Sequence, residues 1–445
     1  MRDIIVVSVV LIAALVALRR PAFGLLTFAF LGFFSPHSYT WGLGRTIPLS
    51  MIVAIATILG LVVSTEAKRL PAQREMILLI LLWLTFGLST IFAIYPDPAY
   101  GQLIYVSKVL LMIVVATIIM NNKERLHSLI KVISYSLGFY ALKCGVSAVI
   151  GGGDFLVYGP ELSFLYANNS IGLALAINIP LLYYLYRRES NYWLRRMLQV
   201  MILFSLPAIL FTYSRGAWLG LMMALALLFL RMKRKFLLVT AVGVLAASLS
   251  SVLPHITPDR LVNRYDQLVN YEKDSSAESR FWNWEFCRRV GTARLTGGGF
   301  LFQSKENYEK YYPEFLERWP GKTWSCHSIW FTMLGDHGVL GLTFWVALIV
   351  SSLMSLRRLR LIGQLEPKNS WLVAFSQSVQ ISFVVFMVVG TFLDAAYFDL
   401  LYYLVAMVVV AKGLVDAMPV RALKTPFAPI IVGSELRSPT FVSIK

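Results

Sequence analysis

The chain alternates long apolar runs with short polar segments along most of its length. A helix needs about 20 mostly apolar residues to cross a bilayer. Two runs, 4–18 and 22–34, are short for a full crossing, so each is either tilted or only partly inserted. The pattern predicts an all-α polytopic membrane protein with about 12 transmembrane helices. The other apolar runs are 48–63, 76–94, 102–120, 128–150, 168–186, 197–213, 216–230, 236–253, 329–356, 371–390 and 400–416.

One long polar segment, 254–328, interrupts this pattern. It holds 11 Lys or Arg and ten Asp or Glu in 75 residues, together with many aromatic residues. Connections are usually about 4–6 residues long, and a loop of this length is more often functional than a plain link. The predicted divisions are N-terminal transmembrane helices (1–253), the large loop (254–328), C-terminal transmembrane helices (329–416) and a cytoplasmic tail (417–445).

The composition indicates lipid as the solvent. The chain is 57% hydrophobic and 15% charged, against roughly 45–50% and 25% in soluble domains. Its net charge of +17 is compatible with nucleic-acid binding, but the basic residues stand in short clusters between apolar runs, which is typical of topology-setting loops. We therefore predict contact with the lipid bilayer and no nucleic-acid partner. The clusters are Arg19–Arg20, Lys68–Arg69, Arg187–Arg188, Arg195–Arg196, Arg231–Lys235 and Arg357–Arg360.

The Lys and Arg bias predicts which loops face the cytoplasm. With Arg19–Arg20, six segments hold 24 Lys or Arg against seven Asp or Glu, and we assign them to the cytoplasmic side. The intervening short loops together hold a single Lys or Arg residue, Arg45, and we assign them to the outer side. Strict alternation then places the large loop and the turn Tyr213–Gly216 outside. The cytoplasmic segments are 64–75, 121–127, 187–196, 231–235, 357–370 and 412–445; the short outer loops are 35–47, 95–101, 151–167 and 391–399.

Arg215, in this outer turn, is a candidate ligand for an anion. Positive charge is disfavoured on the outer side, and a cation at the bilayer interface is costly unless it is solvated, paired or bound to an anion. Arginine suits bidentate contacts with phosphate. The alternative is an arginine that snorkels to water and only sets the topology.

Arg280 belongs to a predicted amphipathic helix, 277–290, in the large loop. Trp284 and Arg288 follow it at intervals of four residues and therefore share its face. The two arginines are either anion ligands or solvated, ion-paired surface charges. Trp284, like the other aromatic residues of the loop, either stacks on sugar rings or packs within the loop and at the membrane interface.

Two histidines near the last long apolar runs are candidate general bases. His327 precedes run 329–356 and would lie at the outer membrane face, where a neutral imidazole can accept a proton. The alternative is a hydrogen-bonded interfacial histidine. His337 lies on a different helical face, beside Asp336, as a buried polar group.

Lys108 falls within run 102–120, and an intramembrane lysine is a functional candidate by default. Alternatively, the Lys108 side chain extends along the apolar surface so that its ammonium group reaches water.

The cysteines and the remaining histidines do not predict a metal site. Cys287 and Cys326 both fall in the outer loop, where they form either a disulfide or two free buried thiols. The five histidines are scattered and form no metal-ligand cluster, so we predict no cofactor. Gly297–Gly299 predicts a turn between 277–290 and a second amphipathic stretch, 304–318; it lacks the lysine and the strand–helix context of a phosphate-binding loop.

Several short motifs occur in an order that resembles the O-antigen ligase and polymerase superfamily of bacterial envelope glycosyltransferases. Residues 35–42 are also similar to a subgroup known as O-glycosylation ligases. The superfamily motifs are Ser214-Arg215-Gly216-Ala217-Trp218, Ser279-Arg280-Phe281-Trp282, Gly297-Gly298-Gly299-Phe300, His327-Ser328, and Gly335-Asp336-His337-Gly338-Val339-Leu340-Gly341.

The resemblance implies a GT-C-like helical fold, a large periplasmic loop, and metal-independent transfer with inversion in the bacterial inner membrane. It implies an undecaprenyl-pyrophosphate-linked glycan as the donor and a lipid A–core hydroxyl as the acceptor. By motif, Arg215, Arg280 and His327 would be catalytic, although the family motif usually reads His-Asn. Asp336-His337 stands where the family has a glutamate and a small residue, so His337 remains a competing base.

Arg288, Lys108, His337 and Trp284 complete the predicted site as candidate substrate-binding residues. Three other functions stay open at this stage. The chain could be an O-antigen polymerase, a protein O-oligosaccharyltransferase, or a transporter of lipid-linked sugars, although it shows no obvious internal repeat of the kind common in transporters.

Overall fold

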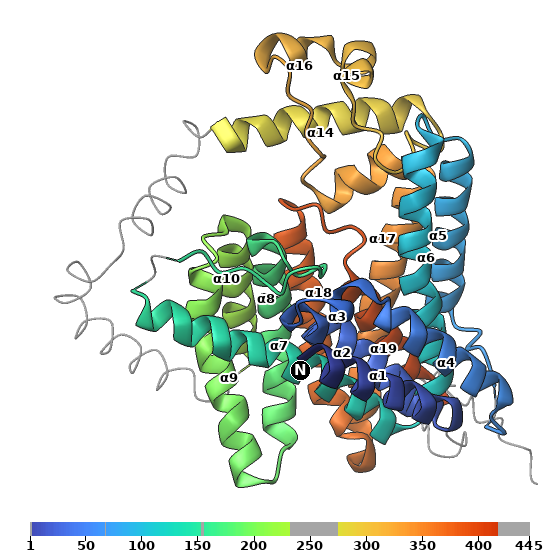
Figure 1. The fold of residues 1–445 in the computed structure, drawn as a ribbon, viewed down its shortest axis with the longest axis vertical. Coiled ribbons are helices and arrows are strands. Elements are labelled where there is room, and N and C mark those ends of the chain that lie inside the picture. Colours follow the sequence, from blue (N-terminus) through green and yellow to red (C-terminus); the bar gives the residue numbers. More distant parts are fainter. Residues whose placement is uncertain (1, 67, 153–154, 232–274, 417–445) are drawn as a thin grey trace, which may run out of the picture.

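The computed structural model describes residues 2–66, 68–152, 155–231 and 275–416, and within these ranges every regular element is a helix (Figure 1). The all-α fold class is therefore confirmed. The predicted span 236–253, the first part of the large loop and the tail 417–445 lie outside the described residues. The helices are α1 (Arg2–Arg19), α2 (Pro21–Phe34), α3 (Leu43–Thr46), α4 (Leu49–Val63), α5 (Arg74–Ile91), α6 (Pro96–Ile119), α7 (Lys123–Ile150), α8 (Asn168–Arg188), α9 (Tyr192–Leu210), α10 (Arg215–Leu230), α14 (Ser275–Ala293), α15 (Lys305–Tyr311), α16 (Pro313–Arg318), α17 (Ile329–Leu365), α18 (Trp371–Gly390) and α19 (Asp399–Asp416), with short 3₁₀ helices at Pro36–Tyr39 and Pro367–Asn369.

Seven of the described helices are long and apolar enough to cross a membrane, which makes the chain a multi-pass membrane protein. They are α5 to α9, α17, and the segment that contains α18. Helices α2, α4 and α10 are apolar but shorter. The 15 residues of α4, for example, extend about 22 Å, less than the roughly 30 Å of a hydrocarbon core. The total of about 12 spans stays a prediction.

Helices α8 and α19 form the centre of the bundle. From Leu400 to Ala411, every side chain of α19 is buried, and α8 is buried in the same way from Ile171 to Leu182. A helix that is apolar on all sides is stable only when other helices surround it. Accordingly α19 packs against α5, α6, α7, α17 and α18, and α8 packs against α7, α9, α10 and α18.

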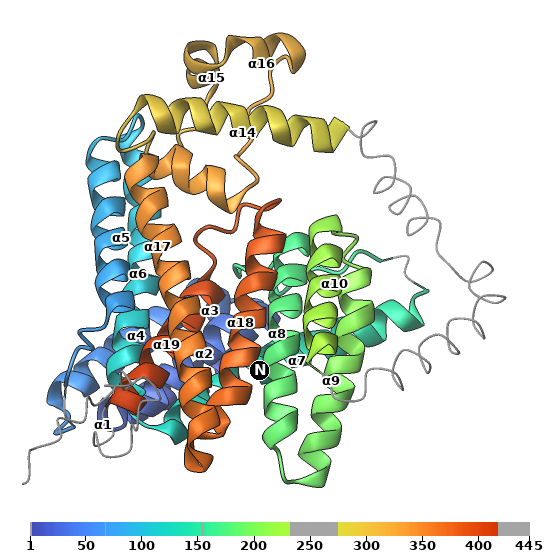
Figure 2. The ribbon, with the colours of Figure 1, turned by 180° about the vertical axis from the view of Figure 1, so that it is seen from behind.

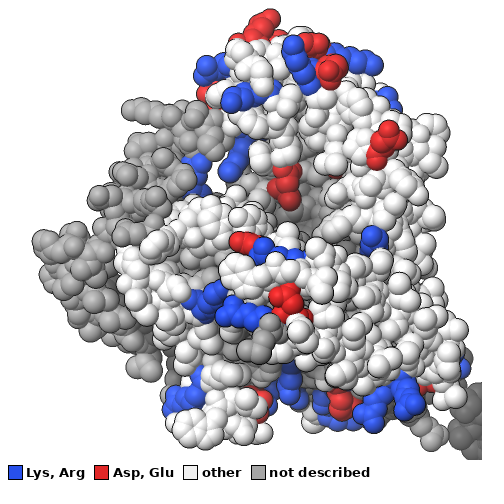
Figure 3. All heavy atoms as spheres, in the orientation of Figure 1, with Lys and Arg blue, Asp and Glu red and all other residues white. Residues whose placement is uncertain are grey.

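The loops assigned to the two sides of the membrane gather at opposite ends of the bundle (Figures 1 and 2). At one end, Arg125 pairs with Glu66 of the neighbouring cytoplasmic loop, with 2.6 Å between Nη1 and Oε2. At the other end, the Ile94 amide donates to the Gly298 carbonyl of the large loop at 2.8 Å. Figure 3 shows charged side chains at the lower end, in a group at mid-height and over α14–α16, with most of the remaining visible surface uncharged. Which side of the membrane each loop faces stays a prediction.

Helix α17 is kinked at Gly338, and the predicted glycine turn, Gly297–Gly299, donates hydrogen bonds to carbonyls just before the kink. Gly338 has φ +66° and ψ −169°, so the regular hydrogen-bond pattern of the α-helix is interrupted at this residue. The carbonyls of Gly335 and Asp336 instead accept hydrogen bonds from the amides of Gly298 and Gly299, at 2.7 and 2.9 Å. Buried backbone groups need such partners. The turn therefore joins the large loop to the kink in α17.

Helices α14, α15 and α16 form a cap with its own small apolar core. The ring of Phe286 stacks on Tyr308, with 3.7 Å between centroids, and Tyr308 stacks on Phe315 at 4.3 Å. A disulfide joins Cys287 of α14 to Cys326, which resolves the choice between bonded and free thiols. The stretch 304–318 forms two helices rather than one, because proline at 313 cannot continue a helix and starts the next instead.

We expect Gly297→Ala to lower thermal stability more than Gly321→Ala. Both glycines have φ +68°, where an alanine costs about 1 kcal/mol in backbone strain. At Gly297 a β-carbon would also lie 2.5 Å from the Gly338 nitrogen, whereas at Gly321 no heavy atom lies within 4 Å. Such overpacking adds about 1–3 kcal/mol. Thermal unfolding of both variants in detergent measures the difference, and equal unfolding temperatures would contradict the proposed role of the turn.

Candidate active site

Arg215 is the first residue of α10 and follows a sharp turn. Tyr213 has φ +53°, and Ser214 caps the helix, its Oγ accepting a hydrogen bond from the Ala217 amide at 3.3 Å. A turn is therefore present where the sequence predicted one, but it ends at the cap Ser214, and Arg215 and Gly216 already belong to α10. It lies at the end of the bundle that carries the cap.

Arg280 lies on α14, which crosses over this end of the bundle (Figure 2). Arg280 and Arg215 both line one cavity of about 210 Å³. The structure thus brings together two arginines that come from a turn between apolar helices and from the cap. The full lining is Asn168, Asn169, Tyr213, Ser214, Arg215, Gly216, Arg280, Val389, Phe392 and Leu393.

Two helices begin at this cavity. Asn168 is the first residue of α8, as Arg215 is of α10. The Asn168 side-chain amide donates to the Thr212 carbonyl at 2.9 Å, which ties the start of α8 to the turn before α10. Helix N-termini attract anions through their unsatisfied amides and their dipole. Together with two guanidinium groups, they make the cavity suitable for a phosphate or pyrophosphate group.

His327 stands beside this cavity and is held by Asp394. Its Nδ1 lies 3.2 Å from Asp394 Oδ2, and its backbone amide donates to Oδ1 at 2.9 Å. Asp394 directly follows Leu393, which lines the cavity. The histidine side chain is 41% exposed, so a substrate hydroxyl can reach the ring.

Asp394 is kept ionised by its neighbours. Burial raises the pKa of this carboxyl, but hydrogen bonding and charge from His327, together with hydrogen bonds from Ser325 and Thr332, outweigh burial and lower the pKa. An ionised carboxylate at Nδ1 fixes the ring tautomer that carries its proton there, which leaves Nε2 as the basic nitrogen.

The backbone of His327 is strained. Its φ is +49°, a region that non-glycine residues seldom adopt and that costs of order 1–3 kcal/mol. Two constraints hold it there: the hydrogen bond from its amide to Asp394 and the disulfide at the preceding residue, Cys326. Residues with a strained backbone of this kind are more frequent at functional sites than elsewhere.

Trp284 packs near one of the residues that line the cavity but does not itself line it. Its ring stacks on Phe331 with 5.3 Å between centroids and lies 6.0 Å from Phe392, which lines the cavity. These ring contacts agree with the second role considered for Trp284, packing within the protein, rather than with stacking on a sugar ring. Tyr308, likewise, is buried in the core of the cap.

The other predicted substrate-binding residues lie elsewhere. Arg288, two turns beyond Arg280, forms an ion pair with Glu285 in which Nη2 and Oε1 are 2.7 Å apart. Lys108 lines a different cavity.

His337 is fully buried. Its Nδ1 is 2.6 Å from Ser89 Oγ and its Nε2 is 2.7 Å from the Tyr397 hydroxyl, which also donates to Asp336 at 2.6 Å. Both ring nitrogens are therefore engaged.

Asp394 and the two asparagines at the start of α8 were not predicted from the sequence. The outer loop 391–399 holds two carboxylates, Asp394 and Asp399. They were the available signal, but nothing in the sequence pairs Asp394 with His327. Within the described residues, no group of three or more His, Cys, Asp or Glu is arranged to hold a metal ion.

Comparison with known proteins adds two family matches. Residues 1–190 match a family of unknown function, DUF5935, and residues 200–346 match the family described as O-antigen ligase. No curated protein matches the chain. The second match contains Arg215, Arg280, His327 and the kink of α17, so this region of the chain is similar to the O-antigen ligase family.

Proposed function

We propose that the chain is an O-antigen ligase that transfers a glycan from undecaprenyl pyrophosphate to a hydroxyl of lipid A–core, with inversion and without a metal ion. The observation that carries the proposal is the cavity where Arg215 and Arg280 meet at two helix N-termini, beside the His327–Asp394 pair. The family supports glycosyl transfer in general. Donor, acceptor and a periplasmic location in the bacterial inner membrane belong to the proposal.

The arginines would bind the pyrophosphate of the donor. Both line a polar cavity next to apolar spans, so a polyprenyl tail could remain in the lipid while its pyrophosphate enters the cavity. As the glycosidic bond to the pyrophosphate breaks, negative charge develops on the leaving oxygen. Preorganised cationic donors stabilise that charge more strongly than they stabilise the ground state.

His327 would act as the general base. Its Nε2 accepts the proton of an acceptor hydroxyl while that oxygen forms a bond to the anomeric carbon, and the pyrophosphate leaves from the opposite face. Asp394, 3.2 Å from Nδ1, orients the ring and stabilises the imidazolium that forms. The disulfide between α14 and the residue before His327 supports an outward-facing location, because disulfides persist in oxidising compartments.

The proposal is tested with the purified chain in proteoliposomes, supplied with undecaprenyl-pyrophosphate-linked glycan and lipid A–core. We expect glycan attached to lipid A–core, at the same rate with and without EDTA. Longer glycan on the lipid carrier would instead identify a polymerase, and a glycosylated acceptor protein would identify a protein O-oligosaccharyltransferase. Passage of the donor across the membrane without any transfer would identify a transporter and overturn the proposal.

We expect His327→Ala to lower the transfer rate by about 10²–10⁴-fold, because it removes the general base. Asp394→Asn should also be strongly impaired, since an amide does not hold the imidazolium as a carboxylate does. Thr343→Val, at an exposed threonine of α17, is the control. It removes a 2.7 Å hydrogen bond to the Val339 carbonyl within the helix and does not touch Asp394, so its rate should change little. Wild-type rates in a folded His327→Ala variant would exclude His327 as the base.

We expect His337→Asn to lower stability rather than the rate per folded molecule. The substitution perturbs two buried hydrogen bonds, which together contribute about 1–3 kcal/mol. Thermal unfolding and the transfer rate, normalised to folded protein, separate the two effects. A stable His337→Asn protein that is as inactive as His327→Ala would make His337 the base instead.

A further inference from the structure

A second cavity, of about 490 Å³, lies among α2, α4, α6 and the start of α19, apart from the arginine cavity. Most of its wall is apolar, with Phe28, Leu31, Met51 and Met112 among the lining residues. Met51 is 45% exposed on the outside of the bundle, so the apolar wall continues onto a surface that faces lipid.

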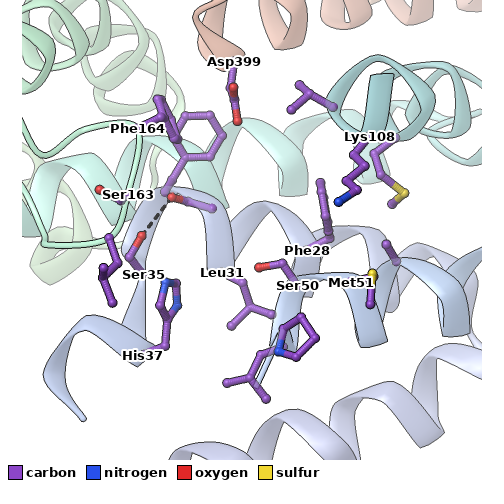
Figure 4. Close-up of a pocket in the computed structure, with 18 of the residues that line it drawn as sticks. Phe28, Leu31, Ser35, His37, Ser50, Met51, Lys108, Ser163, Phe164 and Asp399 are labelled. Atoms are coloured by element: carbon purple, nitrogen blue, oxygen red, sulfur yellow. Dashed lines mark hydrogen bonds between the residues drawn. The ribbon is translucent and has the colours of Figure 1, made fainter. Parts of the chain in front are cut away.

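Three polar side chains converge on this cavity (Figure 4). Lys108 enters from α6, Asp399 from the start of α19, and His37 from the short segment after α2. Among the described residues, no side chain forms an ion pair or a hydrogen bond with Lys108 or Asp399, although they face the same space. The His37 Nδ1 is buried and likewise has no hydrogen-bond partner within the described residues.

In the predicted topology, the cavity lies at the level of the outer lipid headgroups. Its rim is formed by the predicted outer loops, which contribute Ser35, Arg45 and Ser163. Lys108 is about 18 Å along α6 from its first residue, but α6, like α5 beside it, extends beyond α2 and α4 toward α14 (Figure 1). Lys108 therefore reaches the same level as the rim.

The charges restrict what can occupy this space. Lys108 is exposed and Asp399 is half-buried in the structure. An uncharged ligand in the cavity would withdraw both from water without giving either a partner, and such desolvation of a charge is costly. A purely anionic headgroup would pair with Lys108 but be repelled by Asp399. A headgroup that carries both a phosphate and an ammonium group satisfies both side chains, and its acyl chain can lie along Phe28, Leu31 and Met112.

We infer that this cavity binds an aminophospholipid of the bilayer, with its phosphate at Lys108 and its ammonium group at Asp399. The His37 Nδ1 offers a further hydrogen bond to a phosphate or ester oxygen. Arg45, on the rim, is already paired with Glu161, with Nη2 and Oε2 2.5 Å apart, and is not needed as a ligand. The inference does not depend on the proposed transfer reaction.

Lipid retention tests the inference directly. The full chain is purified in detergent and titrated with phosphatidylethanolamine, phosphatidylglycerol or phosphatidylcholine of identical acyl chains, and bound lipid is counted by native mass spectrometry. We expect phosphatidylethanolamine to bind about tenfold more tightly than phosphatidylglycerol, because only its ammonium group makes a charge-assisted hydrogen bond to Asp399. Phosphatidylcholine should also bind more weakly, since its quaternary ammonium has no N–H to donate.

Substitutions at Asp399 and Lys108 test which side chain binds the ammonium group and which binds the phosphate. Asp399→Asn should abolish the preference for phosphatidylethanolamine over phosphatidylglycerol, and Asp399→Glu should retain it. Lys108→Gln should weaken the binding of both lipids about tenfold. Lys131→Gln, at an exposed lysine of α7 outside the cavity lining, should change neither, and thermal unfolding confirms that each variant is folded. Equal retention of the three lipids by the wild type, or an unchanged preference in folded Asp399→Asn, would overturn the inference.

Discussion

The carboxylate of Asp394 holds together the segments that form the candidate active site. It accepts hydrogen bonds from the His327 amide and from Thr332 Oγ1 at 2.9 and 2.8 Å, and from Ser325 Oγ. These donors lie just before and within the first turn of α17, whereas Asp394 follows α18. Because Leu393 lines the arginine cavity, the same short segment fixes both the histidine and one wall of that cavity.

The site is formed where the cap meets the bundle. Arg215 starts a helix of the bundle, and Arg280 comes from the cap. Two connections fix the cap in place: the disulfide from α14 to Cys326, and the hydrogen bonds from the glycine turn to the broken ladder of α17. In the proposed reaction, a lipid-borne pyrophosphate would arrive at the bilayer surface. Residues of both the bundle and the cap could contact it there, which a single polar loop would not allow. Rigid connections of this kind support the preorganisation that electrostatic catalysis requires.

The sequence predicted the features that depend on local pattern. Apolar periodicity located the helices, and the turn before Arg215 and the glycine turn followed from their residue types. It could not predict that Asp394 meets His327, because that contact depends on how α17 and α18 pack. The break at Gly338 was also missed, since one glycine in an apolar run is compatible with a continuous helix and the amides that close the break come from the distant glycine turn. Lys108 was correctly placed within an apolar helix, but its position opposite Asp399 follows from the packing of α6 beside the start of α19.

The central claim is that Arg215 and Arg280 act on the same pyrophosphate. A double-mutant cycle on kcat/KM for glycan transfer, with Arg215→Ala and Arg280→Ala, tests it most directly. Each single variant should lose about 10²–10³-fold in rate. The double variant should lose much less than the product of the two losses, because residues that act as a unit are non-additive. A parallel cycle of Arg215→Ala with Arg288→Ala, at a site paired with Glu285 outside the cavity lining, should show no coupling. Independent, multiplicative losses for Arg215 and Arg280 would contradict a shared pyrophosphate site.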